Sequence, residues 1–422
     1  MKRYGIAICG AGIAGIATAH YLATRFGRDD VVLIDRAPPL SYTSSKSGEN
    51  FRDYWPQACM AGLSARSIEL MEVLASESGG AFGLHYSGYD FVSDSAGSEI
   101  FPSAHLRQHD QGGRVEQILD PDLIRARFPY LSASISQVVR IHRAGAFDVN
   151  ALGMFMLKRA RAAGVERLTA HVSHVERCRG GYRLLTESGD ACETDTLVLA
   201  TGPMNQGLAQ QLGHDLGTRS YLQRKFVIPD PAGVIPRDMP FTIFADPQHL
   251  AWGSADRALV EADADYRWLL EEFPPGLHVK PEPGRGIKLG WAWNREAEEP
   301  RWQPADDDDF PNIVLRGACR FIPGLEAYLE NVPTPVVQFA GYYTRTPENW
   351  PLIGPLDPES RLFTMAALSG FGTMVGCAGG ELLARWIVGE DVPWYAAHFH
   401  PGRRSNPEIM SEIAAIESDG QL

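Results

Sequence analysis

The amino-acid sequence predicts an α/β fold in two domains, one of which is discontinuous. Near the amino terminus, a short apolar run, Tyr4–Gly10, leads through a glycine-rich turn into residues with helical spacing and then into a second strand. Far along the chain, Glu193–Met204 and Leu362–Gly389 again show a strand that runs into a glycine turn. Mixed β-like segments separate these pieces. We therefore expect one domain to resume twice after excursions into the other.

The first of these turns has the features of a dinucleotide-binding unit. Gly10, Gly12 and Gly15 have the spacing G-x-G-x-x-G, and the second strand ends in Asp35, 20 residues after Gly15. Glycines at these positions allow the tight turn and let the backbone approach a pyrophosphate, whose charge the helix amino terminus stabilises. The acid accepts hydrogen bonds from ribose hydroxyls. The unit therefore predicts a Rossmann-like domain.

Nicotinamide and flavin dinucleotides both use such a unit, and the residues that follow it bear on the choice. A nicotinamide dehydrogenase should continue with alternating strands and helices. Here the second strand is followed by a polar loop over 37–56, then by a helix-like stretch, Ser64–Ser78, and then by mixed β-like segments. The pattern thus departs from that of a nicotinamide dehydrogenase.

The composition excludes several classes of function. The chain has 422 residues, 44% of them hydrophobic, and a formal net charge of −13 with no basic stripe, which argues against a nucleic-acid partner. No apolar run reaches the roughly 18 residues of a membrane helix, and no spacing of histidines and carboxylates predicts a metal site. The six cysteines are scattered without a C-x-x-C pair, as in a cytoplasmic protein with reduced thiols. The acidic run Ala305–Phe310 is expected to be a solvated loop.

Seven segments in a fixed order carry a resemblance to a known family. They are GAGIAGIATAHYLA, LIDR, GAFDVNALG, LVLATG, GIKLGW, GYYTRTPENWPLIGP and SGFGTMVGCAGGELLA. Together they resemble the D-amino-acid oxidase family of flavoproteins, in particular its sarcosine oxidase and glycine oxidase branch, from Tyr4 to about Gly389. The resemblance implies bound FAD, a Rossmann-like FAD-binding domain, and an α+β substrate domain with a mixed or antiparallel sheet. The expected ranges are 1–85, 147–222 and 336–422 for the FAD domain, and 86–146 and 223–335 for the substrate domain.

The motifs and the resemblance together predict the FAD-binding residues. Family members that attach FAD covalently use a cysteine, which corresponds to a position near Gly341, or a histidine in the loop over 44–50, which has none here. Non-covalent FAD is therefore expected. The expected binding residues are Gly10, Ala11, Gly12, Ile13, Ala14, Gly15, Asp35, Arg36, Ser44, Ser45, Lys46, Val172, Ala200, Thr201, Gly202, Gly341, Gly370, Phe371, Gly372, Thr373 and Met374.

The resemblance also assigns candidate catalytic residues. Lys288, in GIKLGW, matches the lysine of sarcosine oxidases that lies over the flavin and activates oxygen, since a cation there favours electron transfer to O2. Tyr343 is expected near the flavin. Arg345 is a candidate to hold a substrate carboxylate, because an arginine offers two parallel donors.

Substrate binding is where the sequence departs from the family. Sarcosine oxidases hold the substrate carboxylate partly through a basic residue in the last glycine turn, and that position is Met374 here. In the early loop, Arg52, Trp55 and Glu49 are the substrate-binding candidates, although a turn cap is slightly favoured for Glu49 over contact with a substrate ammonium group. The substrate is therefore an amine without a carboxylate, or one whose acid is bound elsewhere.

The leading hypothesis is an FAD-dependent oxidase that converts a C–N bond of an amine or amino acid to an imine and passes electrons to O2, giving H2O2. One alternative is an amine dehydrogenase with another electron acceptor. Another is a flavoprotein associated with tRNA modification, or a flavin-binding protein without turnover. The sequence leaves open the substrate, its chirality and the oligomeric state.

Overall fold

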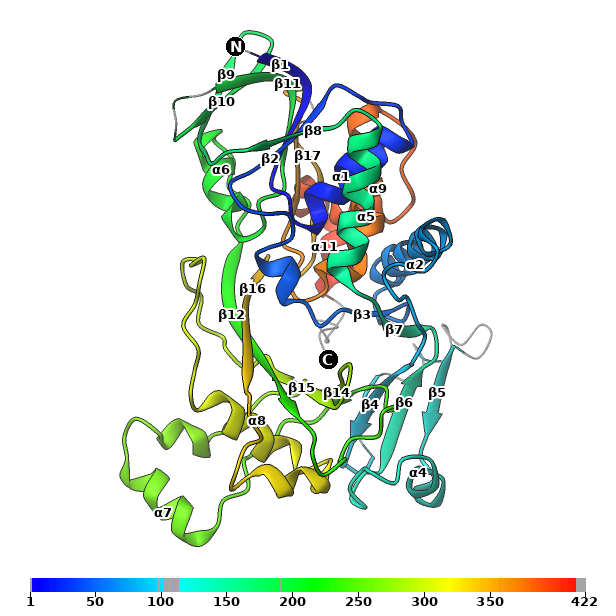
Figure 1. Cartoon of the computed structure of the whole chain (residues 1–422), viewed down its shortest axis with the longest axis vertical. Helices are drawn as coiled ribbons and strands as arrows, with labels where there is room; N and C mark the ends of the chain where they lie inside the picture. Colours follow the sequence, from blue (N-terminus) through cyan, green and yellow to red (C-terminus); the bar gives the residue numbers. More distant parts are fainter. Residues whose placement is uncertain are drawn as a thin grey trace.

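A computed structural model describes residues 2–97, 99–101, 106, 114–187, 189, 191–357 and 359–414. Two eight-stranded sheets lie at opposite ends of the long axis of the molecule (Figure 1). The chain passes from the first sheet to the second and back, so each sheet combines strands that are distant in sequence.

The first sheet carries the predicted nucleotide-binding unit. Its central strand, β1, pairs in parallel with β2 on one side and with β11 on the other. The strand order is β17-β18-β11-β1-β2-β8, and β10 and β9 extend it from β11. Apolar side chains of β1 and β2 are buried on both faces, as expected for parallel strands covered by other layers. The strands are β1 (Lys2–Cys9), β2 (Val31–Asp35), β8 (Glu166–Thr169), β9 (Val172–Cys178), β10 (Gly181–Thr186), β11 (Ala191–Leu199), β17 (Leu352–Asp357) and β18 (Leu362–Ala366).

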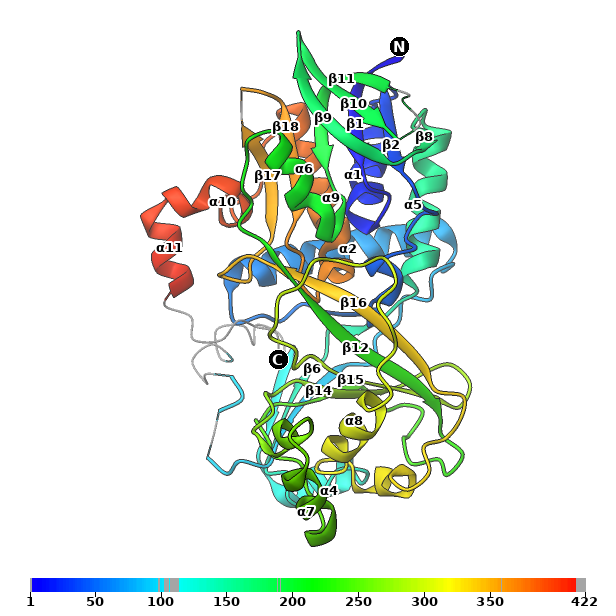
Figure 2. The ribbon, with the colours of Figure 1, turned by 90° about the vertical axis from the view of Figure 1, so that its left-hand side faces the viewer.

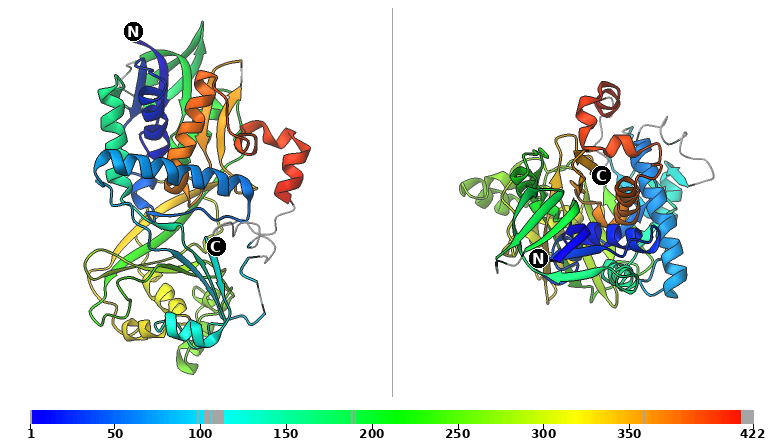
Figure 3. Two further views of the ribbon diagram at one scale, coloured as in Figure 1. Left: turned by 90° about the vertical axis from the view of Figure 1, so that its right-hand side faces the viewer. Right: turned by 90° about the horizontal axis from the view of Figure 1, so that it is seen from above.

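Helices pack against one face of this sheet. Helix α1 contacts both α5 and α9, and α2 lies across the end of this group, toward the second sheet (Figure 3). Small residues allow the close approach of α1 and α9: a Cβ on Gly380 would lie 2.5 Å from the Cβ of Ala17. The helices are α1 (Ile13–Thr24), α2 (Ala58–Ser78), α5 (Val149–Ala162) and α9 (Gly372–Val388).

The second sheet is mixed, as the sequence predicts. Its order is β16-β12-β15-β14-β13-β4-β6-β5, and β13 and β4 are its one parallel pair within the described residues. Helix α8 (Phe310–Ala318) covers the face that points away from the first sheet, over a core that includes Phe226 and Trp291. The strands are β4 (Tyr89–Ser93), β5 (Val115–Ile118), β6 (Gln137–Ile141), β12 (Arg219–Pro229), β13 (Phe241–Phe244), β14 (Leu277–Pro281), β15 (Gly286–Trp291) and β16 (Val337–Arg345).

Shorter elements connect the two parts. They are η1 (Thr43–Lys46), β3 (Asn50–Arg52), α4 (Pro121–Arg127), β7 (Ala144–Ala146), η2 (Gly202–Met204), α6 (Asn205–Gln211), α7 (Ser254–Ala262), η3 (Arg267–Leu270), η4 (Pro323–Tyr328), α10 (Ala396–Phe399), η5 (Pro401–Ser405) and α11 (Pro407–Ala414). Strands β3 and β7 form a separate two-stranded sheet.

The strands β12 and β16 lie at the domain boundary expected from sequence. They form a long antiparallel ribbon that reaches from the first domain across the second (Figure 2). The expected ranges assign 219–222 of β12 and all of β16 to the FAD domain and the rest of β12 to the substrate domain. Both strands are hydrogen-bonded within the second sheet. The glycine and tyrosine motif of 341–345 was expected in the FAD domain because it resembles a cofactor-binding segment, and its backbone forms the edge of the second sheet.

The acidic run and the described helices bear on two further expectations from the sequence. The acidic run Ala305–Phe310 is largely exposed up to Asp309 and leads into α8. None of the described helices has the length and apolar character needed to cross a membrane.

Candidate active site at the junction of the two sheets

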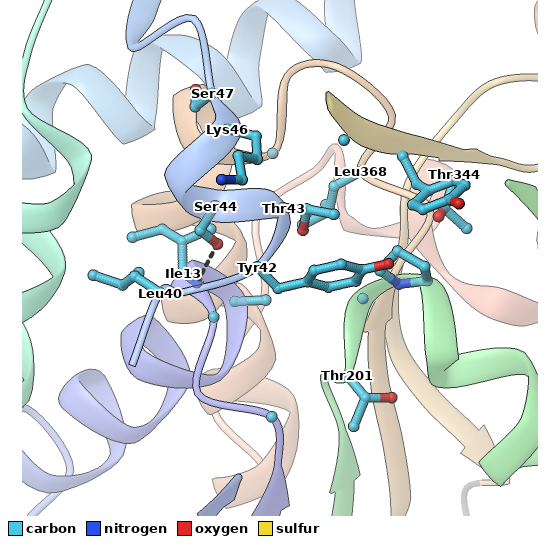
Figure 4. A pocket seen from close by; sticks show the side chains of 18 of the residues that line it. Ile13, Leu40, Tyr42, Thr43, Ser44, Lys46, Ser47, Thr201, Thr344 and Leu368 are labelled. Atoms are coloured by element: carbon cyan, nitrogen blue, oxygen red, sulfur yellow. Dashed lines mark hydrogen bonds between the residues drawn. The ribbon is translucent and has the colours of Figure 1, made fainter. Parts of the chain in front are cut away.

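A cavity of about 730 Å3 lies where the first sheet faces the second. The carboxyl ends of β1, β2 and β11 form one wall, and β12 and β16 form another; η1 and the amino terminus of α9 also line it. Figure 4 shows side chains from several of these elements arranged around the space. Its volume lies in the range typical of sites that bury a small molecule or cofactor.

The backbone around the first glycine turn is packed so closely that a side chain would not fit at Gly10 or Gly15. Gly10 has φ of 108°, and a Cβ there would lie 2.2 Å from the carbonyl oxygen of Ala200. A Cβ on Gly15 would lie 1.9 Å from the carbonyl oxygen of Gly10. The turn therefore requires glycine both for its left-handed conformation and for the approach of α1 to β1.

The acid at the end of β2 is held by backbone amides. Asp35 accepts hydrogen bonds from the N–H of Ala11 at 2.7 Å and of Ala37 at 2.9 Å, one on each carboxylate oxygen. Each oxygen keeps a further acceptor site, and Asp35 lines the cavity. Beside it, the Arg36 guanidinium lies 4.7 Å from the ring centroid of Trp302.

The loop after β2 closes the turn from the other side. The hydroxyl of Ser44 accepts a hydrogen bond from the N–H of Ile13 at 3.1 Å, and thereby caps the first turn of α1 (Figure 4). The neighbouring Ser45 donates instead to the carbonyl of Tyr42 at 2.9 Å. Lys46 extends toward β16, where a Cβ on Gly341 would lie 3.2 Å from its own Cβ.

A second helix amino terminus meets the cavity at α9. Gly372, Thr373 and Met374 line the cavity, and Phe371, at the N-cap position, has no side-chain acceptor for their N–H groups. The hydroxyls of Thr373 and Ser47 are 2.6 Å apart, which ties α9 to the loop after η1. Two helix termini therefore direct partial positive charge into one cavity.

These features fit a dinucleotide. The Gly10 turn admits a pyrophosphate close to the backbone, the amino terminus of α1 favours its charge, and Asp35 has acceptor sites for a ribose. The sequence matches the family described as DAO, FAD dependent oxidoreductase, over residues 5–386.

The chain belongs to this family. It is therefore an FAD-dependent oxidoreductase.

Solved structures share the fold of this DAO-family chain at low sequence identity. L-proline dehydrogenase from P. horikoshii is 20% identical with a TM-score of 0.77, and the match covers 96% of this chain and 98% of that one. Glycine oxidase from Geobacillus kaustophilus is 18% identical with a TM-score of 0.74, covering 96% and 99%. NikD, an amino acid oxidase of nikkomycin biosynthesis, is 17% identical with a TM-score of 0.73, covering 95% and 98%. A search of curated proteins gave no significant match.

Most of the residues predicted to bind FAD line the cavity. They are Gly10, Ala11, Gly12, Ile13, Ala14, Asp35, Arg36, Ser44, Lys46, Val172, Ala200, Thr201, Gly202, Gly341, Gly370, Gly372, Thr373 and Met374. Gly15, Ser45 and Phe371 lie next to lining residues and do not line the cavity themselves. Gly15 packs under the turn, and Phe371 packs on Trp55 at a centroid distance of 5.3 Å.

The candidate substrate residues separate into two groups. Tyr343 and Glu49 line the cavity, and a Cβ on Gly370 would lie 2.7 Å from the Tyr343 hydroxyl. Arg52 and Trp55 are buried behind the wall, with the Arg52 guanidinium 4.3 Å from the Trp55 ring centroid.

Arg345 likewise lies outside the cavity lining. Its guanidinium lies 5.4 Å from the ring centroid of Tyr221 and 5.6 Å from that of Tyr343. It therefore packs behind the ring of Tyr343, which does line the cavity.

Lys288 is buried at the border of the cavity. Its Nζ lies 2.8 Å from a carboxylate oxygen of Glu282 and 3.9 Å from one of Glu49. Glu49 has φ of 62°, and its carboxylate also accepts from the N–H of Val149 at 3.3 Å, at the start of α5. Glu49 therefore caps a helix and at the same time faces Lys288.

Two basic residues of the second sheet line the cavity and were not singled out from the sequence. Lys225 on β12 and His278 on β14 both line the cavity. His278 contacts the carbonyl oxygen of Gly276 through Nδ1 at 3.0 Å. Burial lowers the pKa of His278 to about 4, so the ring is neutral, with its proton on Nδ1 and a lone pair on Nε2. The signal available for Lys225 was a lysine directly before an apolar run, Phe226–Pro229, in a strand-like segment.

Within the described residues, no three His, Cys, Asp or Glu side chains gather in a way that could hold a metal ion.

Proposed function

We propose that this flavoprotein is an amine or amino-acid oxidase that uses O2 as its electron acceptor. The balanced reaction removes two hydrogens across a C–N single bond: the carbon loses a hydride equivalent, the nitrogen loses a proton, and an imine forms. O2 takes up two electrons and two protons to become H2O2. The fold relatives named for proline, glycine and amino acid oxidation support an amino-group substrate.

Bound FAD supplies the acceptor for the hydride equivalent. The Gly10 turn and Asp35 would hold it at one end. The N–H groups at Gly372–Met374 would provide positive potential for the negative charge that reduced flavin carries. Met374 itself offers no charge, so its contribution is limited to the backbone and to apolar contact.

The observation that carries the oxidase proposal is a cluster of lysines on the second sheet. Lys225, Lys280 and Lys288 lie on adjacent strands, and the sheet register places them on one face. Glu282 and Glu49 are the carboxylates that lie among them. Positive charge near the flavin favours electron transfer to O2, because the product of the first electron transfer is an anion.

The test is anaerobic mixing of the purified holoenzyme with a panel of amines and amino acids while the flavin absorbance is recorded, followed by admission of air. An oxidase will bleach with its substrate and recover quickly, with one H2O2 formed per flavin reoxidised. Bleaching without recovery in air would instead identify a dehydrogenase. If no member of the panel bleaches the flavin, the proposed class of substrate is wrong.

A further inference from the structure

Lys225 lies on the cavity wall without a partner for its charge. It is half-buried on β12, and the described part of the chain gives its ammonium group neither a carboxylate nor a hydrogen-bond acceptor. We propose that Lys225 forms a subsite for a carboxylate, and that the substrate is an amine that carries one. This inference rests on the proposed function and adds to it the group by which the substrate is held.

The surrounding charges leave Lys225 uncompensated. Lys280 donates to the carbonyl of Gly48 at 2.9 Å and lies 3.1 Å from Glu282. Lys288 shares the same carboxylate at 2.8 Å and faces Glu49 at 3.9 Å. Two glutamates therefore accompany two lysines, and Lys225 is the third lysine of the cluster. A bound carboxylate would balance this charge.

The neighbouring imidazole does not supply that balance. Gly290 of β15 separates Lys225 from His278: a Cβ on Gly290 would lie 2.9 Å from the Cβ of Lys225 and 2.5 Å from Nε2 of His278. The neutral His278 ring has a lone pair on Nε2 and no net charge. It therefore cannot neutralise the charge of Lys225.

The adjacent wall is aromatic and suits an organic acid. Tyr89 and Phe241 line the cavity, with ring centroids 4.6 Å apart, and Phe241 lies 4.9 Å from His278. Limited access to water strengthens the attraction between an ammonium group and a carboxylate. Met374 occupies the position where sarcosine oxidases have a basic residue, so Lys225 gives this chain a carboxylate anchor on a different element.

The charge on Lys225 should depend on pH. Burial lowers its pKa, and the charges of Lys288 and Lys280 lower it further, while Glu49 and Glu282 oppose this change. A carboxylate binds the protonated lysine, so affinity for a carboxylate should fall as pH rises through that pKa. Replacement of Lys225 should remove this dependence. The groups that face Lys225 are Glu49, His278, Lys280, Glu282 and Lys288.

The test uses the oxidised holoenzyme and needs no turnover. Benzoate and the uncharged, isosteric benzamide are titrated against the wild type and Lys225→Met, and the perturbation of the flavin spectrum gives each Kd. Benzoate should bind the wild type more tightly than benzamide. Lys225→Met should weaken benzoate binding about 10- to 100-fold and leave benzamide within about threefold. Lys225→Arg should retain most of the benzoate affinity, and Lys158→Met, an exposed lysine on α5, serves as the matched control.

The outcomes distinguish failure of the Lys225 subsite from failure of the oxidase proposal. Equal benzoate affinity in the wild type and Lys225→Met, or equal binding of benzoate and benzamide by the wild type, would overturn the subsite. If Lys225→Met fails to take up FAD, Lys225→Gln is measured in its place. If no amine bleaches the flavin while benzoate binding depends on Lys225, the subsite holds and the oxidase proposal fails. A further comparison uses an amine and the amino acid that differs from it by one added carboxylate. If both are oxidised with equal kcat/KM, the oxidase proposal holds and the carboxylate subsite fails.

Discussion

At the scale of single residues, charge burial distinguishes the lysines of the second sheet. Lys280 and Lys288 are almost fully buried and held by carboxylates, whereas Lys225 is half-buried and faces the cavity. A buried ion pair fixes a charge in place, because removal of one partner leaves the other without compensation. Lys288 is therefore suited to keep a fixed positive charge beside the cavity. Lys225 is suited to pair with a charged group of a bound ligand.

We predict that Lys288→Met will slow reoxidation of the flavin by O2 far more than its reduction by substrate. The substitution removes a fixed positive charge close to the cavity and keeps the length of the side chain. Stopped-flow absorbance measures the two half-reactions separately. Equal slowing of both would remove the role assigned to Lys288, and Lys158→Met should change neither.

Gly10→Ala should abolish FAD binding. The new methyl group would meet the Ala200 carbonyl at 2.2 Å in a residue with φ of 108°, so the turn must open. The purified variant should be colourless, with a lower Tm. Gly253→Ala is the matched control, since its nearest contact would be 3.8 Å away, and it should retain full colour.

At the scale of secondary-structure elements, the loop after β2 holds α1 in place. Ser44 caps α1, while Ser45 hydrogen-bonds only within its own loop among the contacts described. Ser44→Ala should lower the free energy of unfolding by about 1 kcal/mol and weaken FAD affinity, because an N-cap hydrogen bond is lost. Ser45→Ala should have a smaller effect on both. Denaturant melts and fluorescence titration with FAD compare the two, and the reverse order would contradict the assignment.

The C-terminal segment is attached to the first domain by an ion-pair cluster. Arg403, in η5, is buried and donates to a Glu348 carboxylate oxygen at 2.7 and 2.9 Å and to the Trp350 carbonyl at 2.9 Å. Glu348→Gln should destabilise the protein by about 3 kcal/mol, because the Arg403 charge would remain buried without a carboxylate. Thermal melts of the holoenzyme measure this loss. Glu359→Gln, at an exposed glutamate, should leave Tm unchanged.

The same cluster predicts a pH dependence. Burial alone would raise the pKa of Glu348, but the charge of Arg403 outweighs it and holds the pKa below the usual value. A carboxyl group whose pKa is lower in the folded state stabilises that state above its unfolded pKa of about 4.5 and loses this effect as pH falls through the folded value. The stability difference between the wild type and Glu348→Gln should therefore shrink below about pH 4.5. A difference that is constant down to pH 3 would contradict this account.

At the scale of the whole molecule, the cavity exists only where two separately built sheets meet. The first sheet supplies the Gly10 turn and Asp35, and the second supplies Tyr343, Lys225 and His278. Lys280 reaches across the junction to the carbonyl of Gly48. This contact ties the wall that carries the lysines to the loop that lines the cavity beside the Gly10 turn.

We predict that FAD is held without a covalent bond. Cys9 lines the cavity, but burial raises the pKa of its thiol and keeps it protonated and unreactive. Precipitation with acid should release all of the yellow colour into the supernatant. Added FAD should also raise Tm in proportion to the logarithm of its concentration, as for any ligand that binds only the native state. Colour retained on the precipitated chain would show a covalent link.

Much of the fold and half of the site could be predicted from the sequence. The unit around Gly10, Gly12, Gly15 and Asp35 is local: its backbone angles, helix start and strand end all follow from residues within one short stretch. The mixed second sheet was expected only from the family resemblance. The sequence did not reveal that β12 pairs with β16 at the edge of this sheet, because the pairing joins residues more than a hundred positions apart.

The sequence by itself determined the glycine turn at the start of the chain and the expectation of a dinucleotide there, since the conformation that Gly10 requires is readily available only to glycine. Only the tertiary structure decided which charged groups meet that cofactor site. Arg52 and Arg345, which sequence reasoning placed at the substrate, pack behind aromatic rings, whereas Lys225 and His278 line the cavity. The physical reason is the register of the second sheet. It places side chains from strands far apart in sequence on one face, and no local pattern encodes that alignment.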